Sequence, residues 1–150
     1  MNEARETLLM LRKRTYELLD PSSDAHAARR ARTGGVLLIL IGISSVAAGT
    51  LGGLAPDLRA IAAGITGIVA LIFFFEYLAR FWVAPEIPHI KAATEIQSRL
   101  RWAVSPGGII DLLAVIPAVA VAAGDAKLGA DSASVFVLLW VLKLATHAPG

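Results

Sequence analysis

The sequence TGGVLLILIGISSVAAGTLGGLAP, at residues 33–56, contains no charged side chain. An α-helix needs about 20 apolar residues, rising about 1.5 Å each, to cross the ~30 Å hydrocarbon core of a bilayer. The composition of the whole chain points the same way, because 56% of its 150 residues are hydrophobic and 17% are charged. In soluble domains, about 45–50% of residues are apolar and about 25% are charged. We therefore predict a transmembrane helix at residues 33–55.

Three further apolar runs follow along the chain, and each contains at least one ionisable residue. We predict the corresponding helices at residues 60–84, 104–124 and 131–147, with Ser105 as the N-cap of the third run's helix and Pro106 in its first turn. Consecutive membrane spans run in opposite directions, so the predicted fold class is an all-α membrane protein, a four-transmembrane-helix antiparallel bundle. This domain covers residues 33–150, and residues 1–32 form a cytoplasmic amphipathic segment before it.

The basic residues indicate how the bundle is oriented. All lysines and arginines except Arg59 and Lys127 lie before the first run, around the second connection or near the end of the fourth run. Because lysine and arginine favour the cytoplasmic side, both termini are predicted to be cytoplasmic. Residues 3–20 place leucines near one helical face, opposite a basic cluster. This pattern is typical of a helix on anionic headgroups, and a solvated or partner-packed helix explains it equally well.

Three ionisable residues are expected at similar depth in the cytoplasmic half of the membrane: Glu76, Asp111 and Lys143. A lone charge near the bilayer centre costs about 2.5–3.5 kcal/mol, so such groups normally face the bundle interior and pair with one another. We predict that these two acids and one base form a triad. Arg80 follows Glu76 by one helical turn, and this spacing allows its side chain either to join the triad or to extend to the membrane interface. We expect Arg80 at the interface.

The residues around these charges resemble a known family. FFFEYLARFW (73–82) and SPGGIIDLLAVIP (105–117) resemble the second and third helices of the voltage-sensor domain of voltage-gated potassium channels, in the ion transport protein family. LRKRTYELLDP (11–21) is similar to the cytoplasmic lead-in of bacterial members. The resemblance implies a bacterial inner or plasma membrane protein.

The resemblance also implies roles for individual residues. In that family an aromatic residue and two acids form a charge-transfer centre, which binds basic residues of the fourth helix as they move through the membrane field. Phe73, Glu76 and Asp111 would fill these roles, and Lys143 would be the innermost basic residue. Further arginines normally occur at every third position outward from that lysine. Those positions here hold Trp140, Val137, Ser134 and Asp131, and Thr66 stands where an outer acid is usual.

The absence of the outer arginines predicts weak or absent voltage sensitivity. Steep voltage gating needs three or four moving charges per subunit, and one lysine remains here. We expect a voltage-sensor-like domain of an ion channel, by resemblance a potassium channel, with weak or no voltage sensitivity. It would flank or regulate a pore-forming segment or subunit, with a homotetramer as one possible assembly. A filter sequence such as TVGYG is lacking, so we expect no pore domain in this chain.

Two alternatives stay open at the level of sequence. One is a freestanding four-helix scaffold that binds a partner through small-residue faces. The other is a sensor-only proton channel, which is disfavoured because the first helix offers hydroxyls and no acid. An enzyme is not expected, since the chain has no cysteine, no nucleophile–base pair and no histidine spacing for a metal. We also expect membrane lipids as partners, with no cofactor and no nucleic acid.

Overall fold

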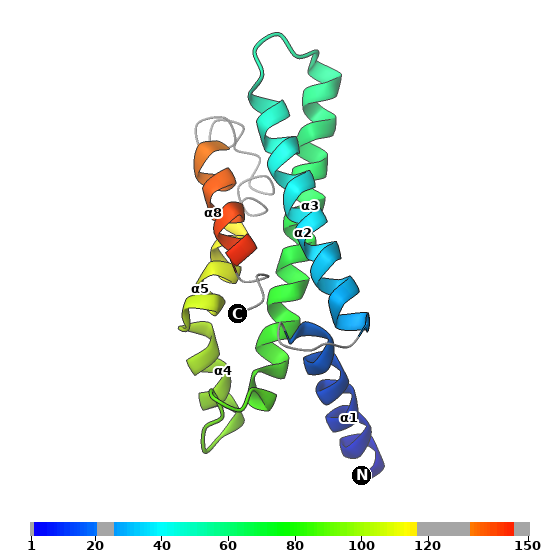
Figure 1. Cartoon of the computed structure of the whole chain (residues 1–150), viewed down its shortest axis with the longest axis vertical. Helices are drawn as coiled ribbons and strands as arrows, with labels where there is room; N and C mark the ends of the chain where they lie inside the picture. Colours follow the sequence, from blue (N-terminus) through cyan, green and yellow to red (C-terminus); the bar gives the residue numbers. More distant parts are fainter. Residues whose placement is uncertain (1, 21–25, 117–132, 146–150) are drawn as a thin grey trace.

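The computed structural model describes residues 2–20, 26–116 and 133–145 of the chain. These residues form helices and their connections, without a β-strand among them (Figure 1). The elements in chain order are α1 (Asn2–Leu19), α2 (His26–Thr50), α3 (Pro56–Val83), the 3₁₀ turn η1 (Ala84–Glu86), α4 (Glu95–Ala103), α5 (Pro106–Leu113) and α8 (Ala133–Ala145). The expectation of an all-helical chain is confirmed for this part of the protein.

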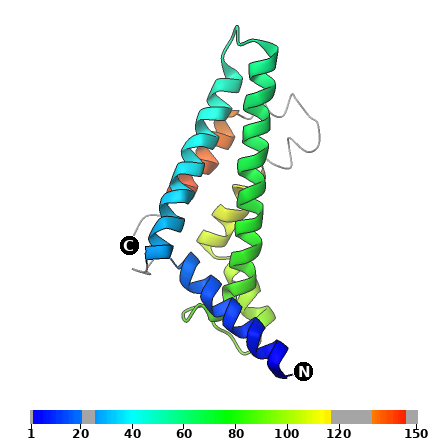
Figure 2. The ribbon, with the colours of Figure 1, turned by 90° about the vertical axis from the view of Figure 1, so that its right-hand side faces the viewer.

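Helices α2 and α3 form a long antiparallel hairpin (Figure 2). Helix α2 begins seven residues before the predicted span, so it includes the end of the segment that we expected to precede the bundle. Helix α3 begins at Pro56, a residue type suited to the first turn because it has no N–H to leave unpaired. The turn between the two helices contains Gly53 at a φ of 87°, a conformation that favours glycine.

Both helices of this hairpin are long and apolar enough to cross a membrane. Only 22% of the most apolar 18-residue window of α2 is buried, and the corresponding value for α3 is 28%. A core helix of a soluble protein would be mostly buried, so the exposed apolar surface favours lipid as the surroundings. The predicted helices at 104–124 and 131–147 extend partly outside the described residues, and the four-span arrangement therefore stays a prediction.

Helices α5 and α8 pack beside this hairpin and close an apolar core. Helix α8 contacts α2 and α5, and α5 also contacts α3. The core contains buried side chains from α2, α3 and α8 and from the residue that follows α5: Ile39, Val46, Val69, Ala70, Phe73, Ala114, Ala133, Phe136 and Trp140. This arrangement places facing residues of α3, α5 and α8 within contact distance of one another.

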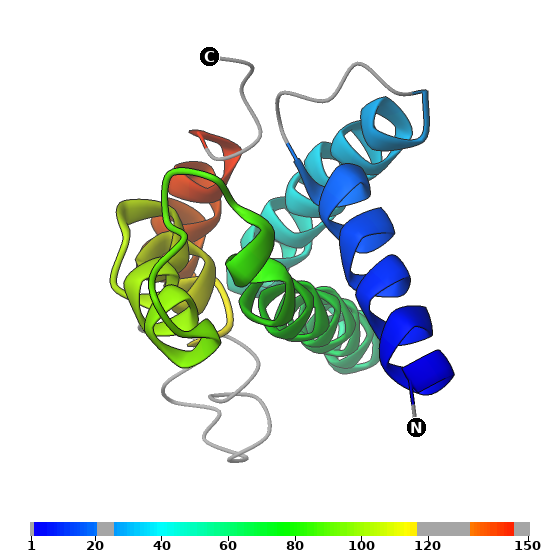
Figure 3. The same ribbon diagram turned by 90° about the horizontal axis from the view of Figure 1, so that it is seen from below.

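One end of the bundle carries the two helices that are polar on average, α1 and α4. Viewed from that end, they lie on opposite sides of the end of α3 (Figure 3). Thr94 caps α4 by accepting a hydrogen bond from the N–H of Gln97. Ser105 caps α5 through the N–H of Gly108, with Pro106 in the first turn, so the start of this helix is confirmed as the sequence predicted.

Candidate functional site

The predicted triad is assembled from three helices. The Lys143 ammonium, on α8, lies 2.6 Å from Asp111 Oδ1 on α5 and 3.2 Å from Glu76 Oε2 on α3. Lys143 is 0% exposed and Asp111 is 1% exposed, whereas Glu76 lies at the edge of the cluster and is half-buried. The three residues that were expected to pair are in direct contact.

Arg80 also contacts this cluster, as one of the two alternatives left open for it, and its depth relative to the membrane interface stays a prediction. Its Nη2 is 2.9 Å from Glu76 Oε1, and its Nε is 3.4 Å from Asp111 Oδ2. The Nε also donates a 3.0 Å hydrogen bond to Glu76. The physical reason lies in Asp111, whose buried Oδ2 accepts no hydrogen bond from the residues that the structure describes and lies beside the charge of Arg80. We define Glu76, Arg80, Asp111 and Lys143 as the ion cluster.

The inclusion of Arg80 changes the charge balance. A triad of two acids and one lysine would carry a net negative charge inside the bundle. The ion cluster has two acids and two bases, so it is neutral when all four groups are ionised. A neutral, mutually paired cluster avoids the cost of several kcal/mol that an isolated buried charge would impose.

Phe73 forms the floor beneath the ammonium. The centroid of its ring lies 4.9 Å from Lys143 Nζ, within the range of a cation–π contact. The same ring meets Trp140 edge to face, with centroids 5.7 Å apart and ring planes at 84°. The structure therefore brings together all four of the residues that the resemblance singled out, and it adds Arg80 to them.

The side chain of Trp140 fits closely against Ala114 and Gly42, and we call this site the seat of Trp140. Its indole Nε1 donates a 3.0 Å hydrogen bond to the carbonyl of Ala114. Its six-membered ring lies against Gly42 of α2, where a Cβ would overlap the ring. Sequence reasoning missed Gly42, because nothing in the α2 sequence shows which of its small residues faces an aromatic on α8.

The other positions that lack arginine have different surroundings. Val137 packs partly buried against the core, and Ser134 is exposed. Asp131 lies outside the described residues. Thr66 is buried, and its hydroxyl lies 2.8 Å from the hydroxyl of Ser45 on α2. Along α3, apolar residues of the core separate this hydroxyl pair from the ion cluster.

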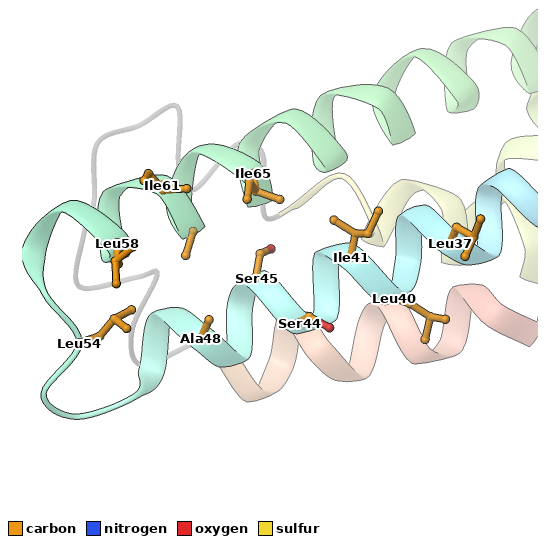
Figure 4. Close-up of a pocket in the computed structure, with 11 residues that line it drawn as sticks. Leu37, Leu40, Ile41, Ser44, Ser45, Ala48, Leu54, Leu58, Ile61 and Ile65 are labelled. Atoms are coloured by element: carbon orange, nitrogen blue, oxygen red, sulfur yellow. The ribbon is translucent and has the colours of Figure 1, made fainter.

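A groove of about 520 Å³ opens between α2 and α3 near their connected ends (Figure 4). Its described lining consists of Leu37, Leu40, Ile41, Ser44, Ser45, Ala48, Leu54, Leu58, Ile61, Ala62 and Ile65. None of these residues is charged, and the two serines are the polar members. The groove therefore offers no group that would act as an acid, a base or a metal ligand.

The ion cluster holds an ammonium rather than offering a reactive group. Lys143 is gripped by two carboxylates and an aromatic ring, and it is closed off from solvent. No family model, curated protein or solved structure matches this chain. The interpretation of the cluster therefore depends on its geometry and on the sequence resemblance.

Proposed function

We propose that this chain is a voltage-sensor-like domain of an ion channel, in which the ion cluster locks the fourth helix in place. It would lie in a bacterial inner or plasma membrane with both termini in the cytoplasm. Its partner would be a pore-forming segment or subunit, by resemblance that of a homotetrameric potassium channel. The domain would orient or regulate this pore while contributing weak or no voltage sensitivity.

The observation that carries the proposal is the double contact of the Lys143 ammonium with Asp111 and Glu76 in a buried, neutral cluster. Moving this lysine along the membrane normal would break both contacts and leave Asp111 buried with only Arg80 as a counter-charge. Removing one partner of a buried ion pair typically costs about 3–5 kcal/mol. The field supplies about 2.3 kcal/mol per charge per 100 mV. At ordinary membrane potentials, breaking these contacts therefore costs more free energy than the field supplies to one charge.

Trp140 adds a second restraint on the same helix. In the related family the position one turn outward from the lysine carries an arginine that moves with the field. Here the position holds an uncharged ring that is hydrogen-bonded to Ala114 and seated against Gly42. Sliding α8 would unseat the ring without any electrical work in return, which supports a fixed helix.

The layout argues against a self-contained proton pathway. Between the ion cluster and the Ser45–Thr66 pair lie Phe73, Trp140 and other apolar core residues. A proton relay needs polar groups or water within hydrogen-bond distance, and an apolar layer interrupts such a chain. We expect vesicles that contain only this chain to show no proton or potassium flux above empty vesicles. Flux of either ion would contradict the proposed role.

Movement of α8 provides the main test of the lock. The chain has no cysteine, so a single Val141→Cys variant can carry an environment-sensitive fluorophore on the exposed side of α8. Leu40→Cys on the exposed side of α2 is the matched control. In vesicles polarised by a potassium gradient and valinomycin, both labels should give fluorescence that does not change with the potential. A potential-dependent change at position 141, with none at position 40, would show that α8 moves and would contradict the lock.

A further inference from the structure

Helix α4 has two faces that differ sharply in exposure. Ser98 and Trp102 are buried against the rest of the protein. Ile96, Leu100 and Val104 recur at every fourth position and are 54%, 56% and 72% exposed. Residues with this spacing form one continuous stripe along a helix and its end. We call these three residues the apolar stripe.

The buried face of α4 is firmly attached, so the apolar stripe is held facing outward. The ring centroid of Trp102 lies 5.2 Å from that of Tyr77 and 6.5 Å from that of Phe81, both on α3. The hydroxyl of Ser98 accepts a 2.9 Å hydrogen bond from the N–H of Ala92 in the preceding connection. Rotating α4 to hide the stripe would break these contacts.

The residues that flank the stripe are basic. Arg99 and Arg101 lie on its two sides, judged by helical spacing. Arg99 pairs with Glu95 at 3.1 Å, whereas Arg101 is exposed and has no ion pair with any residue that the structure describes. Glu95 is also bound by Arg12 of α1, at 2.9 Å. The acid of α4 is thus already paired, and the surface beside the stripe carries a positive surplus.

We infer that the apolar stripe of α4 rests in the headgroup–acyl boundary of an anionic lipid leaflet, with Arg101 on the lipid phosphates. Three observations favour lipid over a protein partner. The flanking arginines match the snorkelling pattern of interfacial helices. Tyr77 and Phe81 of α3 form an aromatic group with Trp102 of α4, as is typical of the membrane–water boundary. The part of α3 that contacts Trp102 also exposes apolar side chains, Leu78 and Trp82, so both helices present apolar residues outward.

This inference depends on α3 crossing a membrane and does not depend on the channel role. It has a consequence for the ion cluster, because α4 leads through the short Ser105 cap directly into α5, which carries Asp111. An anionic leaflet that holds α4 therefore also fixes the start of the helix that positions this carboxylate.

Lipid contact is measured with a quenchable label at the stripe. The Leu100→Cys variant of the full chain is labelled with bimane and placed in bilayers doped with brominated phosphatidylcholine or brominated phosphatidylglycerol. Ile68→Cys, on the exposed middle of α3, is the control inside the hydrocarbon, and His89→Cys, in the exposed connection, is the control in water. We expect strong quenching at position 100, close to that at position 68, and little at position 89.

The contribution of Arg101 to lipid binding is measured by comparing quenching by the anionic lipid with quenching by the zwitterionic lipid. At position 100, brominated phosphatidylglycerol should quench more than brominated phosphatidylcholine, and Arg101→Gln should reduce this preference several-fold. The uncharged interior at position 68 should show no preference. Arg30→Gln, an exposed arginine on α2, should leave the preference at position 100 unchanged. Quenching at position 100 as weak as at position 89, or equal quenching by the two lipids, would overturn the inference.

Discussion

The two halves of the helix bundle are held together by different forces, and we call the half that contains the ion cluster the inner half and the half nearer the turn between α2 and α3 the outer half. In the inner half, four ionisable side chains from α3, α5 and α8 pair with one another beside the Phe73 ring. In the outer half, α8 and α3 each meet α2 through neutral contacts, namely the Trp140 ring on Gly42 and the hydroxyl pair of Ser45 and Thr66. A charge needs an opposite charge in a membrane, whereas an aromatic ring or a hydroxyl does not.

The contrast explains why two kinds of residue are missing together. An outer acid without an outer arginine would be a buried charge without a partner, and Thr66 instead satisfies its hydroxyl within reach of Ser45 and its own helix. The inner half keeps both acids because Lys143 and Arg80 remain. The polar groups of each half are thus satisfied within that half. We expect substitutions among the charges of the inner half to lower the free energy of unfolding more than substitutions among the neutral contacts of the outer half.

The largest effect is expected in the ion cluster. Lys143→Met or Asp111→Leu alone should lower the free energy of unfolding by about 3–5 kcal/mol, because each leaves a buried charge without its main partner. The double variant should lose much less than the sum, since Glu76 and Arg80 remain paired. Denaturant unfolding in micelles measures all three variants. Additive losses would show that Lys143 and Asp111 do not support each other.

The next largest effect is expected where the outer half is packed most tightly. Gly42→Ala should lower the free energy of unfolding by about 1–3 kcal/mol, because the added methyl group overlaps the Trp140 ring. Gly34→Ala, also in α2, is the matched control, since a Cβ there meets open space. The control should be neutral or slightly stabilising. Equal effects of the two substitutions would contradict the proposed seat of Trp140.

A smaller effect is expected outside the bundle, where Arg12 of α1 binds Glu86 at 2.6 Å and Glu95 at 2.9 Å. Arg12→Gln should lower the melting temperature slightly, reflecting about 1 kcal/mol, because the pairs are partly exposed. Arg14→Gln, an exposed neighbour on α1, should change it less. The loss at Arg12 should shrink as salt is added. A salt-independent loss would argue for packing rather than charge.

The same contact predicts a pH dependence. The hydrogen bond from Arg12, aided by the charges of Arg12 and Arg99, lowers the pKa of Glu95 below its ordinary value of 4.5. A lowered carboxyl pKa stabilises the folded protein above the ordinary value, and this contribution is lost as the pH falls through the lower folded value. Between pH 7 and pH 5 the destabilisation caused by Arg12→Gln should therefore stay constant, and it should shrink at more acidic pH. A loss of the effect near pH 6 would contradict this assignment.

The smallest effect is expected at the hydroxyl pair. Ser45 and Thr66 contact each other and also the carbonyls of Gly42 and Ala62, so two hydroxyl protons serve three contacts. Removing one hydroxyl leaves the other bonded to its own helix. Ser45→Ala should thus cost only about 0.6–1 kcal/mol in micelles. A loss as large as that for Asp111→Leu would erase the contrast between the two halves.

Much of the inner half was predictable from sequence, because buried charges have few ways to be satisfied. Glu76, Asp111 and Lys143 interrupt apolar runs at matching depth, and that pattern alone indicates that they meet. The contact of Arg80 with the cluster was harder to predict. Its spacing allowed either direction, and the choice depended on the second oxygen of Asp111, whose orientation only the fold determines.

The contacts of the outer half and those of α1 were harder to predict from the sequence. The fit of Trp140 to Gly42 joins positions on two helices through shape alone, and the other three glycines of α2 were equally plausible from the sequence. Arg12 meets Glu86 and Glu95 across separations of 74 and 83 residues, so local patterns do not reveal the pairing. The start of α5, by contrast, was predicted because the Ser105 cap and Pro106 act within one turn.

The central claim is that Lys143 stays between its two carboxylates when the membrane potential changes. Gating-charge recording on membranes that contain a counted number of chains tests it most directly. The lock predicts less than about one elementary charge per chain, unchanged within error by Lys143→Gln. A transfer of about three or four charges per chain would contradict it, and so would a smaller transfer that disappears in Lys143→Gln.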